Sequence, residues 1–215
     1  MKKEKLILVG GGGHCKSIIE VIESTDAFKI KGILDVAEKV GQKILGYEII
    51  GTDADIEKYV KKGYSFHITI GHILHNNVRT KIYKKIKEAS GSLPVIIAST
   101  ALVSKHARVG EGTVMMHNSF VNANAVVGIN CIVNTGAVIE HDAAIEDHCH
   151  ISTGAYINGE CKVGSDSFVG SRSILVQCTV VADHNVIAAG SVITENTEPY
   201  GLYAGNPAVL KRKNN

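Results

Sequence analysis

Residues 121–150 read VNANAV–VGINCI–VNTGAV–IEHDAA–IEDHCH, and each of these five hexads opens with valine or isoleucine. The spacing continues in both directions, so that every sixth residue is aliphatic: Val103, Val109, Met115, Val121, Val127, Val133, Ile139, Ile145, Ile151, Ile157, Val163, Val169, Leu175, Val181, Ile187 and Ile193. A period of six matches neither an amphipathic helix nor an alternating strand. It is typical of a solenoid with a triangular coil, in which one hexad forms each side and eighteen residues complete a coil.

A second position of the hexad is as regular as the first. The residue four places after each aliphatic position is small: Ala107, Thr113, Ser119, Ala125, Cys131, Ala137, Ala143, Cys149, Ala155, Cys161, Ser167, Ser173 and Thr179, with Asn185 as the first exception. We expect the aliphatic side chains to fill the interior of the prism and the small ones to lie where it is narrowest. Three of the five cysteines fall on this position, which indicates buried small side chains rather than ligands.

Composition excludes several classes of protein. The chain has 215 residues and a net charge of only +2, which gives no indication of nucleic-acid binding. The five cysteines are odd in number and contain no CxxC pair, so neither a disulfide framework nor a zinc ribbon is expected. The first apolar run is too short for a signal peptide, and no segment is long enough to span a bilayer. We therefore expect a cytoplasmic protein.

The N-terminal part has a different pattern. A buried strand is expected at residues 5–9, followed by the glycine run Gly10–Gly13 and an amphipathic helix. In a strand–glycine turn–helix unit, backbone N–H groups are free to bind a phosphate. The motif is not a complete GxGxxG, because Cys15 and Lys16 stand where the last glycine would be. Asp35 ends a second strand, 25 residues after Gly10, where a carboxylate can reach a ribose or a base edge.

Further strands are expected at residues 65–71 and 94–97, with a basic helix between them. This alternation of strands and helices predicts a small parallel sheet. Residues 1–93 carry 16 Lys and Arg against 11 Asp and Glu, a surplus that suits a ligand with phosphates. The prediction is thus a Rossmann-like α/β domain at residues 1–97 and an all-β parallel β-helix at residues 98–215.

Several segments together resemble a known family. VGGGGHCK, ILD, TIG with the later NNVR, NTGAVIEHDAAI and the terminal YAGNPA are similar to the NeuD-like and PglD-like hexapeptide-repeat sugar acetyltransferases, over nearly the whole chain. The resemblance implies a left-handed β-helix, a homotrimer with active sites between neighbouring prisms, and acetyl-CoA as co-substrate. It also implies a nucleotide-linked amino sugar held by the N-terminal domain. Family members often have IGNN or IGDN before the arginine of the next helix, whereas here residues 72–75, HILH, intervene.

The resemblance also implies roles for individual residues. His141 matches the general base, and the following acid, Asp142, would orient it. Gly159 lies eighteen residues, or one coil, after His141, so its N–H is a candidate donor to the oxyanion. Asn134 matches a position near the amino group of the sugar. The nucleotide-sugar residues would be Gly10, Gly11, Gly12, Gly13, His14, Asp35, Gly71 and Arg79, and the coenzyme residues would be His150, Gly159, Gly190, Gly205, Asn206 and Pro207.

Acetyl transfer to the 4-amino group of a UDP-linked 4-amino-4,6-dideoxy sugar, for a surface glycan or glycoprotein, is therefore the favoured function, with no metal required. One alternative is O-acetylation of a sialic-acid-type sugar. A second is a γ-class carbonic anhydrase, which shares the prism. His148 and His150 with His117 or His141 would supply its three histidines, although His117 and His141 are 24 residues apart and so fall on different corners. A third is a nucleotide-sugar binding protein without catalysis.

Overall fold

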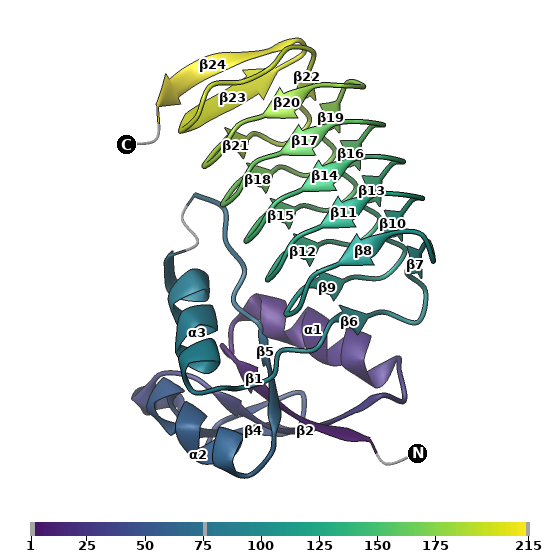
Figure 1. Cartoon of the computed structure of the whole chain (residues 1–215). Coiled ribbons are helices and arrows are strands. Elements are labelled where there is room, and N and C mark those ends of the chain that lie inside the picture. Colours follow the sequence, from purple (N-terminus) through teal and green to yellow (C-terminus); the bar gives the residue numbers. More distant parts are fainter. Residues whose placement is uncertain (1–2, 75–76, 214–215) are drawn as a thin grey trace.

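The chain folds into an N-terminal α/β domain with a parallel β-helix stacked on it (Figure 1). This computed structural model describes residues 3–74 and 77–213. His75, the last of the residues that depart from the family pattern, lies outside that part. No helix in the described ranges is both long and apolar enough to cross a membrane.

The N-terminal domain contains a five-stranded sheet in the order β3-β4-β2-β1-β5, parallel except for the β3–β4 hairpin. Its strands are β1 (Glu4–Val9), β2 (Phe28–Leu34), β3 (Lys43–Ile44), β4 (Tyr47–Gly51) and β5 (Ser65–Ile68). Its helices are α1 (Gly13–Glu23), α2 (Ile56–Lys61) and α3 (Asn77–Glu88), with 3-10 turns at Ala37–Lys39 and Asp53–Asp55. The predicted parallel sheet is confirmed, but the β3–β4 hairpin was not expected.

The β-helix consists of three parallel sheets, and the chain visits them in turn, two residues at a time. The first sheet holds β7 (Leu102–Val103), β10 (Phe120–Val121), β13 (Val138–Ile139), β16 (Tyr156–Ile157), β19 (Ile174–Leu175) and β22 (Val192–Ile193). The second holds β8 (Arg108–Val109), β11 (Val126–Val127), β14 (Ala144–Ile145), β17 (Lys162–Val163) and β20 (Val180–Val181). The third holds β6 (Ile96–Ile97), β9 (Val114–Met115), β12 (Ile132–Val133), β15 (His150–Ile151), β18 (Phe168–Val169), β21 (Val186–Ile187), β23 (Gly201–Gly205) and β24 (Ala208–Lys213).

The coil length agrees with the predicted eighteen residues. Val133 pairs with Ile151, and Ile139 pairs with Ile157, so each residue lies directly under its equivalent in the next coil. The aliphatic side chain of each hexad and the small side chains, including Cys131, Cys149 and Cys161, form one buried core along the prism. The parallel β-helix expected from the repeat, left-handed as the resemblance implies, is therefore the fold of this part.

Asn185, the exception in the small position, is explained by the end of the prism. It is fully buried, donates from Nδ2 to Thr197 Oγ1 (2.5 Å) and accepts from Gly201 N–H at Oδ1 (2.5 Å). These bonds connect the last coils to the closing β23–β24 hairpin. Tyr203 of β23 packs against the end of the core. A polar side chain is tolerated here because both ends of its amide are hydrogen bonded.

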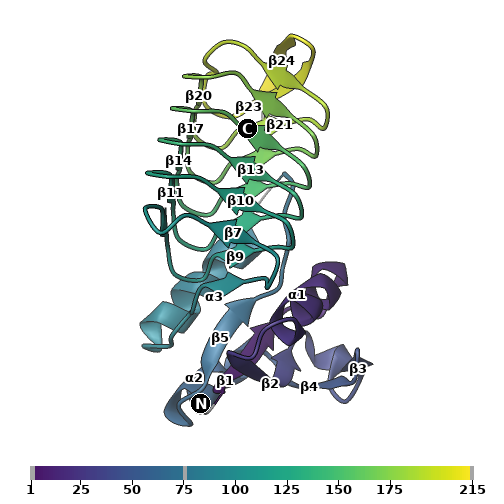
Figure 2. The same cartoon turned by 90° about the vertical axis from the view of Figure 1, so that its right-hand side faces the viewer.

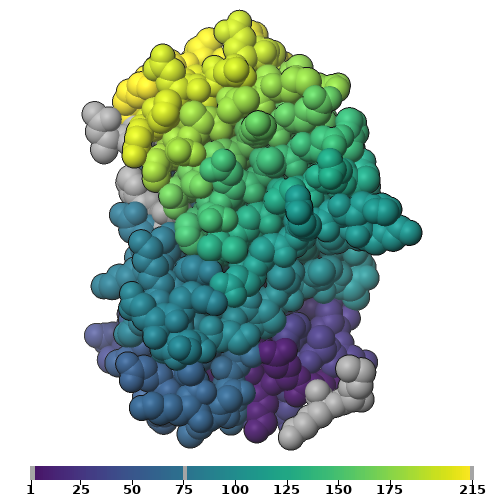
Figure 3. All heavy atoms as spheres, viewed as in Figure 1, coloured from purple at the N-terminus to yellow at the C-terminus, as the bar shows by residue number. Residues whose placement is uncertain are grey.

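The two parts share a core. Helix α1 packs its buried face, including Cys15, Ile18 and Ile22, against both the N-terminal sheet and the first strands of the third sheet. Strand β6, expected to belong to the N-terminal sheet, instead pairs with β9. The β-helix therefore begins at Ile96, two residues before the expected boundary. Figure 2 shows α1 beside the lowest coils, and the space-filling view in Figure 3 shows the surfaces of the two parts in contact.

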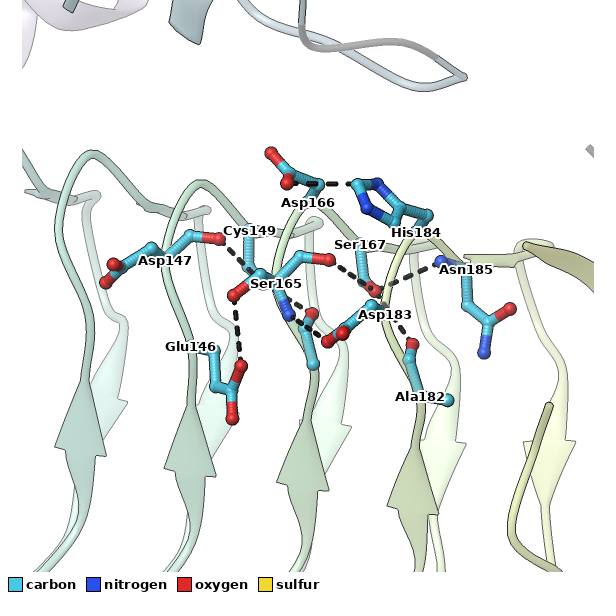
Figure 4. Close-up of polar contacts among 11 residues, drawn as sticks. Glu146, Asp147, Cys149, Ser165, Asp166, Ser167, Ala182, Asp183, His184 and Asn185 are labelled. Atoms are coloured by element: carbon cyan, nitrogen blue, oxygen red, sulfur yellow. Dashed lines mark hydrogen bonds and ion pairs between the residues drawn. The ribbon is translucent and has the colours of Figure 1, made fainter. Parts of the chain in front are cut away.

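The turns between sheets form three corners, named here by one residue each. The His141 corner (residues 140–143 and their equivalents in other coils) joins the first and second sheets. The His148 corner (residues 146–149 and equivalents) joins the second and third sheets, and the Asn134 corner (residues 134–137 and equivalents) joins the third and first. Side-chain ladders stabilise the corners: at the His148 corner, Ser165 N–H donates to Asp183 Oδ1 (2.9 Å) and Ser165 Oγ to Glu146 Oε2 (3.0 Å), as Figure 4 shows.

Candidate active site

His141 is exposed at its corner and bonded to the next residue. Its Nδ1 lies 2.9 Å from Asp142 Oδ2, and Asp142 adopts a left-handed backbone conformation (φ 61°) at the turn. The hydrogen bond with Asp142 raises the pKa of His141 above its ordinary value, with a further contribution from Glu140 and Glu160. A neutral imidazole that donates from Nδ1 to a carboxylate has its Nε2 lone pair free to accept a proton. The arrangement is that of an oriented general base.

Gly159, one coil further along the chain, lies against the ring of His141. A Cβ atom at residue 159 would be 2.8 Å from His141 Cε1 and 2.9 Å from Nε2, so only glycine leaves space for this ring position. The Gly159 carbonyl accepts from Cys178 N–H (3.0 Å), while the Gly159 N–H has no acceptor within residues 3–74 and 77–213. The glycine predicted one coil along is thus in contact with the His141 ring, and its free N–H could donate to an oxyanion.

Asn134 and His150 are brought together by the structure. Asn134 Nδ2 is 3.2 Å from His150 Nε2, and His150 Nδ1 is 2.8 Å from the carbonyl oxygen of His72. Because a carbonyl only accepts, His150 carries its proton on Nδ1, and its Nε2 accepts from the Asn134 amide. Thr135 N–H donates to Asn134 Oδ1 (2.8 Å), which leaves Asn134 with one N–H to offer a ligand.

Four histidines meet where the N-terminal domain contacts the prism. The rings of His14 and His72 lie 6.4 and 5.5 Å from that of His150, and His67 is fully buried in β5 close to His14. Burial, followed by the charges of neighbouring groups, lowers the pKa of His14 and His72 to about 3, and burial lowers that of His150 to about 4. His14 Nε2 and both ring nitrogens of His67 and His72 have no hydrogen-bond partner among the described residues. These rings are neutral at physiological pH.

Arg79, predicted to bind the nucleotide sugar, is fully buried in the structure. Its side chain has no exposed surface, because it lies under α3 between the end of β5 and the His148 corner. Nη1 donates to the carbonyl oxygens of Ile68 (2.6 Å) and Ile70 (3.1 Å), and Nε donates to that of Asn130 (3.2 Å). The role of Arg79 is therefore structural: it bonds the N-terminal domain to the prism.

The glycine run forms the turn between β1 and α1. Gly10 has φ 107°, and a Cβ at this residue would overlap the side chain of Ile70, whereas Gly12 and Gly13 have open space around them. Gly11 N–H donates to Asp35 Oδ2 (2.6 Å). The turn therefore has open backbone at the start of a helix, where an anion is stabilised.

Asp35 is held from three sides. Its carboxylate accepts from the Gly11 and Val36 N–H groups and pairs with Lys39 Nζ (3.1 Å). Burial acts to raise the pKa of Asp35, but these hydrogen bonds and the lysine charge outweigh it and hold the pKa below the ordinary value. Beside it lies a cavity of about 510 Å³, lined by residues that include Gly10, Asp35 and Asp53. The cavity adjoins the predicted nucleotide residues.

The remaining predicted residues lie in separate places. Gly71 borders His14, whereas Gly190 is a turn residue (φ 69°) of the Asn134 corner. Gly205, Asn206 and Pro207 form the turn of the β23–β24 hairpin at the far end of the prism. Within one chain, His141 and Gly159 are at one corner of the first sheet, and Asn134 with Gly190 at the other. A single chain therefore does not bring all the predicted residues together.

Among the described residues, the three histidines that a carbonic anhydrase would need do not lie together. His117 lies at the Asn134 corner and accepts or donates a bond with Thr100 Oγ1 (2.8 Å), while His141 and His148 lie at the other two corners. His148 packs edge-on to Tyr83 of α3, at 5.4 Å between ring centres. A cavity of about 700 Å³ near this corner is lined by residues of α3 and by Asp166 and His184, which Figure 4 shows close to one another.

Two participants were not predicted from the sequence. Asn124 donates from Nδ2 to Asp142 Oδ1 (2.6 Å), and His72 supplies the carbonyl that sets the tautomer of His150. Asn124 precedes Asp142 by one coil, so applying the eighteen-residue step backwards from Asp142 would have identified it. His72 gave no comparable signal, because it lies in the segment that departs from the family pattern.

Comparison with known proteins places this geometry in context. The PglD N-terminal domain family matches residues 5–86. A structure of the H141N mutant of perosamine N-acetyltransferase from Caulobacter crescentus, in complex with CoA and GDP-perosamine, is 28% identical, with 97% of each chain covered and a TM-score of 0.91. The acetyltransferase domain of PglB from Neisseria gonorrhoeae, in complex with acetyl coenzyme A, is 29% identical over 97% of this chain and 100% of that one, with a TM-score of 0.89.

Over nearly its whole length the chain is thus similar in sequence and fold to solved sugar N-acetyltransferases, and residues 5–86 match the PglD N-terminal domain family. WeeI from Acinetobacter baumannii, at 16% identity and a TM-score of 0.69, has the same fold as this acetyltransferase. A search of curated proteins found no match to the chain. The likeness to these CoA- and acetyl-CoA-bound N-acetyltransferases identifies the protein as an acyltransferase.

Proposed function

We propose that this enzyme transfers an acetyl group from acetyl-CoA to the 4-amino group of a nucleotide-linked 4-amino-4,6-dideoxy sugar, for a surface glycan or glycoprotein. The observation that carries the proposal is the His141–Asp142 pair packed against Gly159, whose N–H has no acceptor in the described part of the chain. The His141–Asp142 pair supplies a base for an amine proton, and the Gly159 N–H supplies a donor for a carbonyl oxygen.

His141 and Gly159 then have defined tasks. As the amine nitrogen attacks the thioester carbonyl carbon, the Gly159 N–H stabilises the negative charge on the carbonyl oxygen. His141 Nε2 accepts the proton that the nitrogen loses, and Asp142 stabilises the imidazolium ion. Collapse of the tetrahedral intermediate breaks the carbon–sulfur bond, and the proton on His141 passes to the thiolate of coenzyme A. A new amide and a free thiol result.

The glycine turn is proposed to bind the diphosphate of the sugar nucleotide. Gly12 and Gly13 leave open space at the start of α1, and the cavity beside Asp35 is next to it. UDP is our favoured nucleotide, and GDP is the alternative because the C. crescentus structures contain GDP-perosamine. Gly205, Asn206 and Pro207 at the far hairpin are proposed to contact the coenzyme, at the opposite end of the prism from the nucleotide.

A homotrimer is proposed to complete the site. The outward residues of the first sheet are all apolar, namely Leu102, Phe120, Val138, Tyr156, Ile174 and Val192, and Figure 2 looks onto this face. Tyr156 and Leu102 are about half exposed. An apolar stripe of this kind is suited to burial against a second copy. Packing the first sheets around a threefold axis would bring the Asn134 corner of one subunit towards the His141 corner of the next.

We place the reaction in the cytoplasm. The five cysteines are free, and four of them are buried. Free thiols in the core are maintained in a reducing compartment, where acetyl-CoA and sugar nucleotides are also made.

The test measures thiol release from acetyl-CoA with UDP-, GDP- and dTDP-linked 4-amino-4,6-dideoxy sugars and with free sialic acid. We expect release with one of the nucleotide amino sugars. Replacing His141 by Ala should lower kcat by about 10²–10⁴, the usual contribution of a general base. The relative from C. crescentus has been crystallised as H141N and H141A mutants in complex with CoA and GDP-perosamine. Release with sialic acid alone would make the enzyme an O-acetyltransferase, and near full activity of the Ala variant would exclude His141 as the base.

A further inference from the structure

Asp142 is bonded on both of its carboxylate oxygens. Oδ2 accepts from His141 Nδ1 (2.9 Å), and Oδ1 accepts from Asn124 Nδ2 (2.6 Å). Asn124 lies one coil below Asp142, since the two residues are eighteen positions apart. Both adopt the left-handed backbone conformation (φ 61° each). The three side chains form one continuous hydrogen-bonded row along the His141 corner.

We infer that Asn124 is a positioning residue for the reaction, which holds the Asp142 carboxylate in the orientation that keeps the His141 proton on Nδ1. The inference rests on the proposed role of His141 as the base. Asp142 is exposed, so water competes for its carboxylate, and a short hydrogen bond from an adjacent coil restricts its rotation. The restriction matters because the base works through Nε2, and the Nδ1 bond determines which nitrogen is free.

The surrounding charges support this role. Asn124 is the largest of the influences that lower the pKa of Asp142, ahead of His141 itself. The groups that face His141 are Asp142, Glu140 and Glu160, all acidic, so its protonation responds to how closely Asp142 is held. Asn124 donates through an amide and has no charge of its own. It therefore fixes geometry without adding a titrating group.

The chain contains a matched control at the same corner. Asn122 Nδ2 donates to Glu140 Oε2 at the same distance, 2.6 Å, also across one coil. This bond has the same chemistry as that of Asn124, but it ends on a carboxylate that is not bonded to His141. A change caused merely by loosening the corner should follow from Asn122→Ala as much as from Asn124→Ala.

The experiment records NMR spectra of the full chain with ¹³C- and ¹⁵N-labelled histidine, in which the His141 signals are assigned from the His141→Gln variant. The tautomer of His141 and its pKa are measured for the natural chain, Asn124→Ala, Asn124→Asp and Asn122→Ala. We expect both Asn124 variants to lose the dominance of the Nδ1–H tautomer. The pKa of His141 should fall in Asn124→Ala, where Asp142 is released, and rise in Asn124→Asp, where a negative charge is added. Asn122→Ala should keep the natural tautomer.

An unchanged tautomer in both Asn124 variants, or an equal change in Asn122→Ala, would overturn the inference. These spectra need no substrate, so they distinguish failure of the inference from failure of the proposed function, which thiol release tests separately. With an active substrate, kcat should fall about tenfold in Asn124→Ala with KM little changed, since the interaction acts on the base rather than on binding.

Discussion

At the scale of single residues, the site depends on a side chain and a backbone group one coil apart. His141 and Gly159 touch because an eighteen-residue coil places equivalent positions directly over one another, and because residue 159 has no side chain. The acidic neighbours of His141 then determine when it is able to act. Two predictions follow from these contacts.

The first concerns pH. The pKa of His141 is raised from its ordinary value of 6.5, first by the Asp142 hydrogen bond. Only the neutral imidazole is a base, so kcat/KM should increase with pH through an inflection above 6.5 and then reach a plateau. A pH profile of thiol release at subsaturating sugar nucleotide measures this. An inflection below 6.5 would mean that the titrating group is not His141 in its present environment.

The second prediction concerns the space between Gly159 and the imidazole ring of His141. Gly159→Ala places a Cβ within 2.9 Å of His141 Nε2, so the imidazole must move, although the Gly159 backbone has no positive φ that alanine would strain. A displacement of about 1 Å can cost about 10²-fold in rate. We expect kcat to fall by about that factor while the thermal midpoint of unfolding changes little. A fully active variant would show that the ring adjusts without loss.

At the scale of elements, α3 and the end of β5 are joined to the prism by one buried arginine. Arg79 has three backbone acceptors, and burial lowers its pKa to about 10, so it is still charged at neutral pH. Only the forked guanidinium reaches carbonyls in three directions, and a lysine ammonium would leave some of them unpaired.

Arg79→Lys should therefore lower the free energy of unfolding by about 2–4 kcal/mol, given about 1.5–3 kcal/mol for a hydrogen bond to a charged group. Urea denaturation measures the change. Lys81→Arg, an exposed substitution on the same helix, is the control and should have little effect. A drop no larger than that of the control would mean that the carbonyls find other partners.

The elements also show what the sequence allowed us to predict. The strands of the prism were predictable residue by residue, because a six-residue repeat imposes the same burial at the same position in every coil. Arg79 was assigned to the ligand because an arginine after a glycine-ended strand resembles a family position, and its burial depends on packing that no local pattern records. Likewise β6 was assigned to the N-terminal sheet, since a two-residue strand carries no information about its partner. Asn124 was accessible through the coil period but depended on knowing that Asp142 matters.

At the scale of the whole molecule, the apolar face of the first sheet separates the two corners that carry candidate site residues. A charge at its centre should oppose assembly. Tyr156→Glu is expected to convert a species of about three times 22.9 kDa into a monomer, with loss of thiol release, because the neighbouring subunit would no longer supply its corner. Light scattering after size exclusion measures the mass. Lys162→Glu, on the outward side of the second sheet, should remain assembled.

The constant coil has a consequence for substrate length. The glycine turn that is proposed to bind the nucleotide lies in the N-terminal domain, and the prism rises by one coil, about 4.8 Å, with every eighteen residues. The number of coils that precede His141 therefore sets the position of this residue along the prism. Removing one hexad before His141 would move the base to another corner. Adding three hexads there would keep the corner and shift the base along the prism by one coil. With the diphosphate held on the N-terminal domain as proposed, the reach from it to the base can change only in steps of eighteen residues while the corner is kept.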